Sequence, residues 1–173
     1  MSMLDDRLRA LAGIDLQEVR GAAFGGEVPI TAALVNRLLA RKLAHVQGPI
    51  TGIVLDPHEG QRFTADLALR GQPFLKAARV EVQIEKQPEL PGHPTFLLRW
   101  SMPGLGPLAR MAAPLVSQFK KLPPGIQIDS DHVLIDLRLL LEAYGYADLL
   151  PHLTGLHVET RQGTFIVRFD VRA

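Results

Sequence analysis

The chain has 173 residues, of which 47% are hydrophobic and 21% are charged, and its formal net charge is +1. This length suits a single domain that buries a core without covalent staples, so we expect one domain over residues 1–173. The spread of charges lacks the basic stripe of a nucleic-acid binder, and the absence of cysteine excludes disulfides, thiolate catalysis and cysteine zinc sites.

The N-terminal segment, residues 1–25, is expected to hold a short helix and a strand. Leu4, Leu8 and Leu11 recur with the spacing of an amphipathic helix, and "LQEVRGAAFGG" favours a strand that ends in its glycines. A secretory signal would start with basic residues before an apolar run, whereas two aspartates come early here. No window approaches the roughly 20 apolar residues of a spanning helix. We therefore expect a cytoplasmic protein that does not insert into membranes, unless a longer precursor was trimmed.

The clearest helix signal lies in "VPITAALVNRLLARKLAHVQG", at the start of the body that we expect over residues 28–171. Thr31 is a suitable N-cap because its hydroxyl can accept from a free amide of the first turn. Gly48 and Pro49 are expected to end the helix. One face collects Val35, Leu38, Leu39 and Val46, with Leu43 at its edge.

A run of amphipathic strands follows this helix. The segments "ITGIVLDP", "QRFTADLALRG", "AARVEVQIEK" and "TFLLRWSM" are separated by turn or loop residues. Most of these segments alternate apolar and polar residues with a period of two, which indicates a sheet with one buried and one wet face. The expected inward residues of the last three are Phe63, Ala65, Leu67, Leu69, Val80, Val82, Ile84, Phe96, Leu98 and Trp100.

The C-terminal third predicts two short strands, a helix and a hairpin. The short strands flank the turn at Asp129 to Asp131, Asp136 is placed to cap the helix, and Gly145 is a natural stop. The apolar stripe of the helix is Leu137, Leu140, Leu141 and Tyr144. The closing hairpin turns at Gln162–Gly163 and points Phe165, Val167, Phe169 and Val171 inward. Few connections are helical crossovers, so we predict an α+β fold with an antiparallel sheet and additional short helices.

No catalytic or cofactor motif stands out. The six histidines form no metal-binding helix pair, and no serine lies in a nucleophile elbow. We therefore expect no enzyme activity, no cofactor and no metal. One enzymatic alternative stays open, in which His132 acts with Asp129 or Asp131.

The stretch "SMPGLGPLARMAAPLVSQFKKLPPG" is the most unusual part of the sequence. Its helical wheel gathers Leu108, Met111, Ala112, Leu115, Val116 and Phe119 on one face. Pro114 would kink or divide this helix, and Arg110 and the short length exclude a spanning segment. Two interpretations stay open: the face closes the core over the sheet, or it forms a movable cover over an apolar cavity.

Three segments together resemble the tubular lipid-binding (TULIP-like) domains of small bacterial type. These are "VPITAALVNRLLARKL", "HVLIDLRLLLEAYG" and "LTGLHVETRQGTFIVRFDV", which carry an opening helix, a strand-to-helix step and a closing hairpin. The resemblance is one of pattern and order over most of residues 28–171. It implies a long, curled antiparallel sheet wrapped around an amphipathic helix, with lipid held in the groove and no catalytic residues.

The resemblance also implies which side chains would face a ligand. They are Val35, Leu38, Leu39, Phe96, Leu98, Trp100, Leu108, Met111, Leu115 and Phe119. The expected function is non-catalytic binding or carriage of a lipid or other apolar molecule, with transient membrane contact at most. The alternative is a protein-interaction or scaffold module that uses the same apolar face for a homodimer or another partner.

Overall fold

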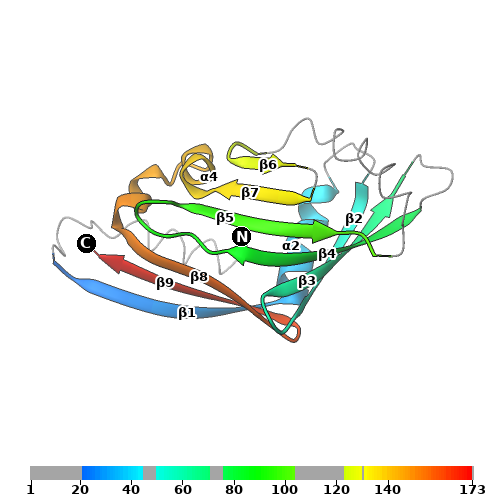
Figure 1. Cartoon of the computed structure of the whole chain (residues 1–173), viewed down its shortest axis with the longest axis horizontal. Coiled ribbons are helices and arrows are strands. Elements are labelled where there is room, and N and C mark those ends of the chain that lie inside the picture. The colour runs from blue at the N-terminus through cyan, green and yellow to red at the C-terminus, as the bar shows by residue number, and fades with distance from the viewer. Residues whose placement is uncertain (1–20, 45–49, 71–75, 104–122, 130, 173) are drawn as a thin grey trace.

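The computed structural model describes residues 21–44, 50–70, 76–103, 123–129 and 131–172 (Figure 1). The fold is mainly antiparallel sheet, with 58% of the described residues in strands and a few short helices, which confirms the α+β prediction. The expected helix at Met3 to Ala12 lies outside the described residues, as does the stretch from Gly104 to Leu122.

The larger sheet has six strands in the order β2-β3-β4-β5-β7-β6, each antiparallel to its neighbour. Every strand that the alternation predicted between residues 50 and 101 is present. The bounds are β2 Ile50–His58, β3 Arg62–Leu69, β4 Ala77–Lys86, β5 Thr95–Ser101, β6 Ile126–Ile128 and β7 His132–Asp136.

The smaller sheet has three strands in the order β1-β9-β8. Its strands are β1 (Ala23–Thr31), β8 (Leu153–Arg161) and β9 (Thr164–Arg172), and the expected turn of the hairpin falls at Gln162 and Gly163. The resemblance implied one long curled sheet, but the structure has two sheets that are neither closed nor strongly curled.

Strand β1 differs from its prediction because it runs through residues that usually interrupt strands. The strand was expected to end at Gly25 and Gly26, yet it continues to Thr31. The bond from Ala32 N–H to Gly163 C=O sets the register, so alternate residues from Ile30 backwards bond to β9. Pro29 therefore lies at a position whose backbone faces the free edge, where its missing N–H disturbs no ladder bond and blunts the edge against further pairing.

Helix α2 (Ala32–Leu43) follows β1 directly and lies along the free edge of β2. Thr31 is its N-cap, as predicted, and accepts a hydrogen bond from the Leu34 amide. The Asn36 side chain accepts from Leu55 N–H at 2.7 Å and donates to Leu55 C=O at 2.9 Å. The amide thus satisfies the N–H and C=O of Leu55, which would otherwise be unpaired at this edge of β2.

Helix α4 (Leu137–Ala143) and the short 3₁₀ helix η2 (Ala147–His152) form one corner of the molecule. Asp136 caps α4 by accepting from two amides of its first turn, as predicted. Tyr144 was expected on the buried stripe but is 60% exposed, because the helix ends at Ala143 and the chain leaves the helical direction there. No helix in the described part of the chain has the length and apolar character needed to span a bilayer.

The two sheets are joined along a seam where β8 meets the larger sheet. Gln87 donates to Val158 C=O at 2.7 Å and accepts from Val158 N–H at 3.0 Å, so its side chain imitates a neighbouring strand. Further along β8, the Thr160 hydroxyl accepts from Arg62 N–H at 2.8 Å. We call these bonds the seam. The Gln87 bonds satisfy backbone groups of Val158 that the ladder with β9 leaves free, and the Thr160 hydroxyl satisfies the Arg62 amide.

The packed core lies beside this seam. Ile84, Phe96 and Leu137 form its buried cluster. Leu98, Ile135, Leu156 and Val158 pack against the cluster and are only partly buried. The smaller sheet therefore contributes to the same core as the larger one.

Candidate functional site

Each sheet has one apolar side, and we refer to the two apolar sides together as the inner face. Residues paired directly across antiparallel strands share a side, so the register assigns the face of every strand residue. Across the larger sheet, for example, Phe63 pairs with Val82 and Val82 pairs with Trp100.

The inner face contains no charged side chain. In the larger sheet its residues are Ile50, Ile53, Leu55, Pro57, Phe63, Ala65, Leu67, Leu69, Ala78, Val80, Val82, Ile84, Phe96, Leu98, Trp100, Ile126, Ile128, Val133 and Ile135. In the smaller sheet they are Phe24, Gly26, Val28, Ile30, Leu153, Leu156, Val158, Thr160, Phe165, Val167, Phe169 and Val171.

Most of the inner face is only partly covered. Its buried members are Ile50, Pro57, Ala65, Ala78, Val80, Ile84, Phe96 and Thr160, and the others are half-buried or exposed. Phe24 and Val28, at the β1 edge, are each 41% exposed. Burial of apolar area contributes roughly 25 cal/mol per Å², so the half-covered part of this face is a surface that further apolar contact would stabilise.

The three predicted ligand-facing residues of α2 lie beside β2 and β1. Val35 and Leu39 are half-buried, and Leu38 is 40% exposed. No residue of α2 is fully buried, so the helix leaves its apolar face incompletely covered. Strands β3 and β4 separate β2 from β5, and the structure therefore does not bring these three side chains into one cluster with those of β5.

The three predicted residues of β5 share the inner face, as the alternation indicated. Phe96 is 8% exposed and belongs to the buried cluster, and Leu98 packs against that cluster. Trp100 lies next along the face and is half-buried. The remaining four predicted residues, Leu108, Met111, Leu115 and Phe119, lie outside the described residues.

Trp100 carries a polar group that sequence patterning did not reveal. Its indole Nε1 is buried and has no hydrogen-bond partner within the described part of the chain. Buried polar groups are nearly always hydrogen-bonded, so an indole N–H left without an acceptor is an unusual feature of an apolar face. From the sequence alone, Trp100 can be recognised only as a large apolar side chain. The signal therefore appears only in three dimensions.

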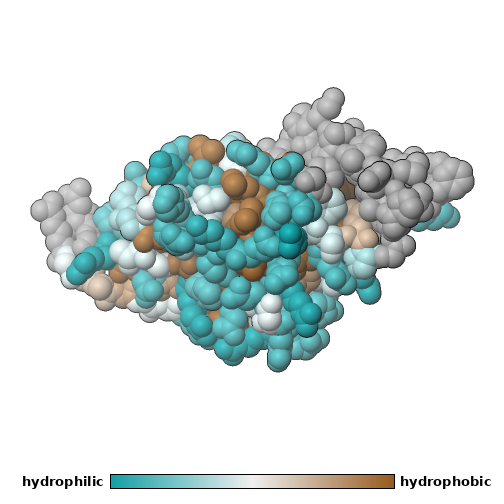
Figure 2. Space-filling view, in the orientation of Figure 1, coloured by the Kyte–Doolittle hydropathy of each residue, from teal (hydrophilic) through white to brown (hydrophobic). Residues whose placement is uncertain are grey.

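The opposite sides of both sheets are mostly polar and carry several ion pairs. Arg79 donates two hydrogen bonds to Asp66, which hold the pKa of that carboxyl below its ordinary value. On the smaller sheet, the Arg161 hydrogen bond likewise lowers the pKa of Glu159. Figure 2 shows a mostly hydrophilic surface with separate hydrophobic patches. Exposed pairs of this kind contribute little to stability and keep these sides wet.

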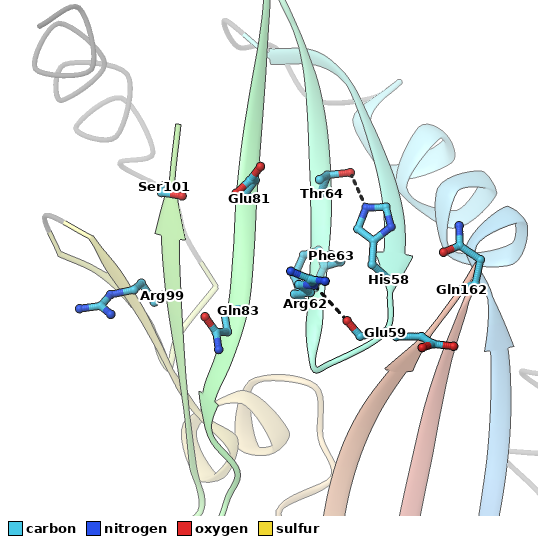
Figure 3. Close-up of a pocket in the computed structure, with 10 residues that line it drawn as sticks. All are labelled: His58, Glu59, Arg62, Phe63, Thr64, Glu81, Gln83, Arg99, Ser101 and Gln162. Carbon is cyan, nitrogen blue, oxygen red and sulfur yellow. Dashed lines mark hydrogen bonds between the residues drawn. The ribbon is translucent and has the colours of Figure 1, made fainter. Parts of the chain in front are cut away.

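A polar hollow of about 500 Å³ lies at the end of the larger sheet near the β2–β3 turn (Figure 3). Side chains from four neighbouring strands line it, among them His58, Thr64, Gln83 and Arg99. His58 Nε2 lies 3.4 Å from Thr64 Oγ1, but no carboxylate, imidazole and hydroxyl are arranged as a nucleophilic triad among these lining residues. The hollow is thus a solvated part of the polar side.

His132, the residue of the enzymatic alternative, lies within a network of ion pairs. Its Nδ1 is 2.7 Å from Asp131 and its Nε2 is 3.1 Å from Glu85, and Arg99 contacts both carboxylates. Both ring nitrogens thus face carboxylate oxygens. Within the described ranges, no three histidine, aspartate or glutamate side chains are placed to hold a metal ion.

The chain was also compared with known proteins. No family model matches it, and neither a curated protein nor a solved structure shows significant similarity to it.

Proposed function

We propose that the protein binds a lipid or other apolar molecule on the inner face without catalysing a reaction. The observation that carries the proposal is the incomplete burial of this uncharged face. Apart from prolines, only eight apolar side chains are buried among the described residues, whereas many more inner-face side chains stay half-covered. A ligand chain laid on such a surface would gain roughly 0.8 kcal/mol per buried CH₂.

The resemblance to tubular lipid-binding domains supports the same proposal. The order of an opening helix, amphipathic strands and a closing hairpin is present in the described chain. The weaker curl of the sheets would make the ligand site an open trough rather than a tube. In this proposal the contacts come from the β5 residues Leu98 and Trp100. The helix residues Val35, Leu38 and Leu39 lie across β3 and β4 from them and would form a separate apolar contact.

Two neighbouring leucines of β5 allow a matched test. Leu98 points to the inner face, whereas Leu97 pairs with Leu134 on the opposite side, and both are half-buried. We expect the neutral dye N-phenyl-1-naphthylamine to bind the wild type, and Leu98→Gln to weaken its affinity about tenfold, because the new amide has no partner there. Leu97→Gln should leave the affinity within about twofold.

Fluorescence titration of the three proteins measures these affinities, with circular dichroism confirming that each variant is folded. A wild type that fails to enhance dye fluorescence would contradict the proposal. Equal loss in both variants would contradict binding to the inner face alone. A larger loss in Leu97→Gln would place the dye on the other side, where Leu97 and Leu134 line a hollow of about 530 Å³.

A protein-interaction module is the second candidate, because exposed apolar residues gather at the corner formed by α4 and η2. Leu139 and Leu149 are 40% and 39% exposed, and Tyr144 and Tyr146 are 60% and 39% exposed. Such clusters often mark contact surfaces. This candidate predicts a stable dimer or complex through the corner, with no ligand bound. The blunted edge at Pro29 speaks against dimerisation by strand pairing at β1.

A further inference from the structure

The indole of Trp100 occupies a distinctive place on the inner face. Trp100 lies at the end of β5, where it pairs with Val82 of β4 and its backbone N–H donates to Asp131 C=O. The backbone N–H is therefore satisfied, while the side-chain Nε1 is buried with no acceptor among the described residues. The group without a partner is an uncharged indole N–H, which can donate a hydrogen bond and cannot accept one.

Among the described residues, the neighbours of this donor supply no free acceptor. The inner-face positions next to Trp100 are Val82 on β4 and Leu98 on the same strand, both apolar. The other polar side chain of the inner face, Thr160, already accepts the Arg62 amide at the seam. A buried donor without an acceptor costs free energy. A ligand that brings an acceptor to this N–H should therefore bind more tightly than a ligand without one.

We propose that the Trp100 indole N–H is the polar anchor of the apolar ligand site, and that the ligand is a neutral amphiphile with a carbonyl oxygen. This inference rests on the proposed function and adds the ligand class to it. An ester, ketone or amide oxygen accepts one hydrogen bond and carries no charge. A ligand carboxylate would lose its hydration on the inner face and find no cationic side chain there to pair with. Burial of such an unpaired charge is strongly disfavoured.

Three probes of matched skeleton test the anchor. Hexanophenone carries a carbonyl where hexylbenzene carries a methylene group, and 6-phenylhexanoate carries a carboxylate. Each probe displaces N-phenyl-1-naphthylamine from the wild type and from Trp100→Phe, which keeps an aromatic ring and removes the N–H. We expect the ratio of the hexanophenone affinity to the hexylbenzene affinity to fall about tenfold in Trp100→Phe, and 6-phenylhexanoate to bind more weakly than hexanophenone.

A second measurement keeps the wild-type chain and does not depend on the variant folding. The sequence has one tryptophan, so the ¹H–¹⁵N spectrum has one indole cross-peak, which belongs to Trp100. Hexanophenone should move this proton downfield as the hydrogen bond forms. Hexylbenzene should not move it downfield.

The outcomes separate this inference from the proposed function. If the dye and all three probes fail to bind, the proposed function fails and the anchor with it. If the probes bind but the affinity ratio and the indole proton stay unchanged, the site stands and the anchor at Trp100 is wrong. Binding of 6-phenylhexanoate as tight as that of hexanophenone would overturn the neutral ligand class.

Discussion

Replacing Gly125 by alanine is expected to lower the melting temperature by about 10 °C, the largest effect of the substitutions considered. Gly125 is buried just before β6 and has a φ of +90°, a conformation that costs alanine about 1–2 kcal/mol. A Cβ there would also lie 2.5 Å from the Asp136 carbonyl oxygen and 3.0 Å from the Leu140 nitrogen. Those atoms are backbone at the start of α4, so relieving the clash would disturb the helix cap and the β6–β7 pairing, at a further cost of about 1–3 kcal/mol.

Gly145→Ala is the matched control for this effect. Gly145 also has a positive φ, +79°, but no atom lies within 4 Å of the position of its added Cβ. Its substitution should show only the conformational cost, about 1 kcal/mol. Thermal unfolding followed by circular dichroism compares the two. Equal losses in both variants would show that Gly125 does not closely approach α4.

Gln87→Glu is expected to destabilise the fold by about 2–3 kcal/mol by breaking the seam. The carboxylate can still accept from Val158 N–H, but its other oxygen would face Val158 C=O, to which Gln87 donates at 2.7 Å. A donor is thereby replaced by a charge that repels the carbonyl. Urea unfolding at pH 7 measures the loss in the free energy of unfolding.

The dependence of stability on pH provides an internal control for Gln87→Glu. The carbonyl disfavours the charged form, so the pKa of the introduced carboxyl should be raised above its unfolded value of about 4.3. When the pKa is higher in the folded state, protonation stabilises the fold. The loss in the free energy of unfolding relative to the wild type should therefore shrink as pH falls from 7 towards 4. Gln127→Glu, at an exposed position of β6, should change stability by less than about 0.5 kcal/mol at pH 7. A deficit that is constant with pH would contradict the assigned hydrogen bond.

Local chemistry made much of the fold predictable. The alternation in β3 and β4 and the capping residues Thr31 and Asp136 depend on neighbours within a few positions, and all are confirmed. The inward placement of Phe96 and Leu98 followed from the same period of two.

Contacts between distant residues explain what could not be predicted. Strand β1 crosses two glycines because β9, more than a hundred residues later, supplies its partner. The division into two sheets depends on the seam, where Gln87 bonds a residue 71 positions away. Ile166 is 5% exposed although it lies on the same side of β9 as Arg168, which no alternation pattern indicates. The unpartnered indole of Trp100 likewise follows from its surroundings and not from its residue type.

Native mass spectrometry of the protein, purified from cells without detergent, tests apolar-ligand binding most directly. The open inner face predicts a monomer that carries a bound small molecule, which organic extraction releases and which is apolar and uncharged. A spectrum that contains only the unliganded chain would contradict ligand binding. Unliganded dimers would instead support an interaction surface at the corner of α4 and η2.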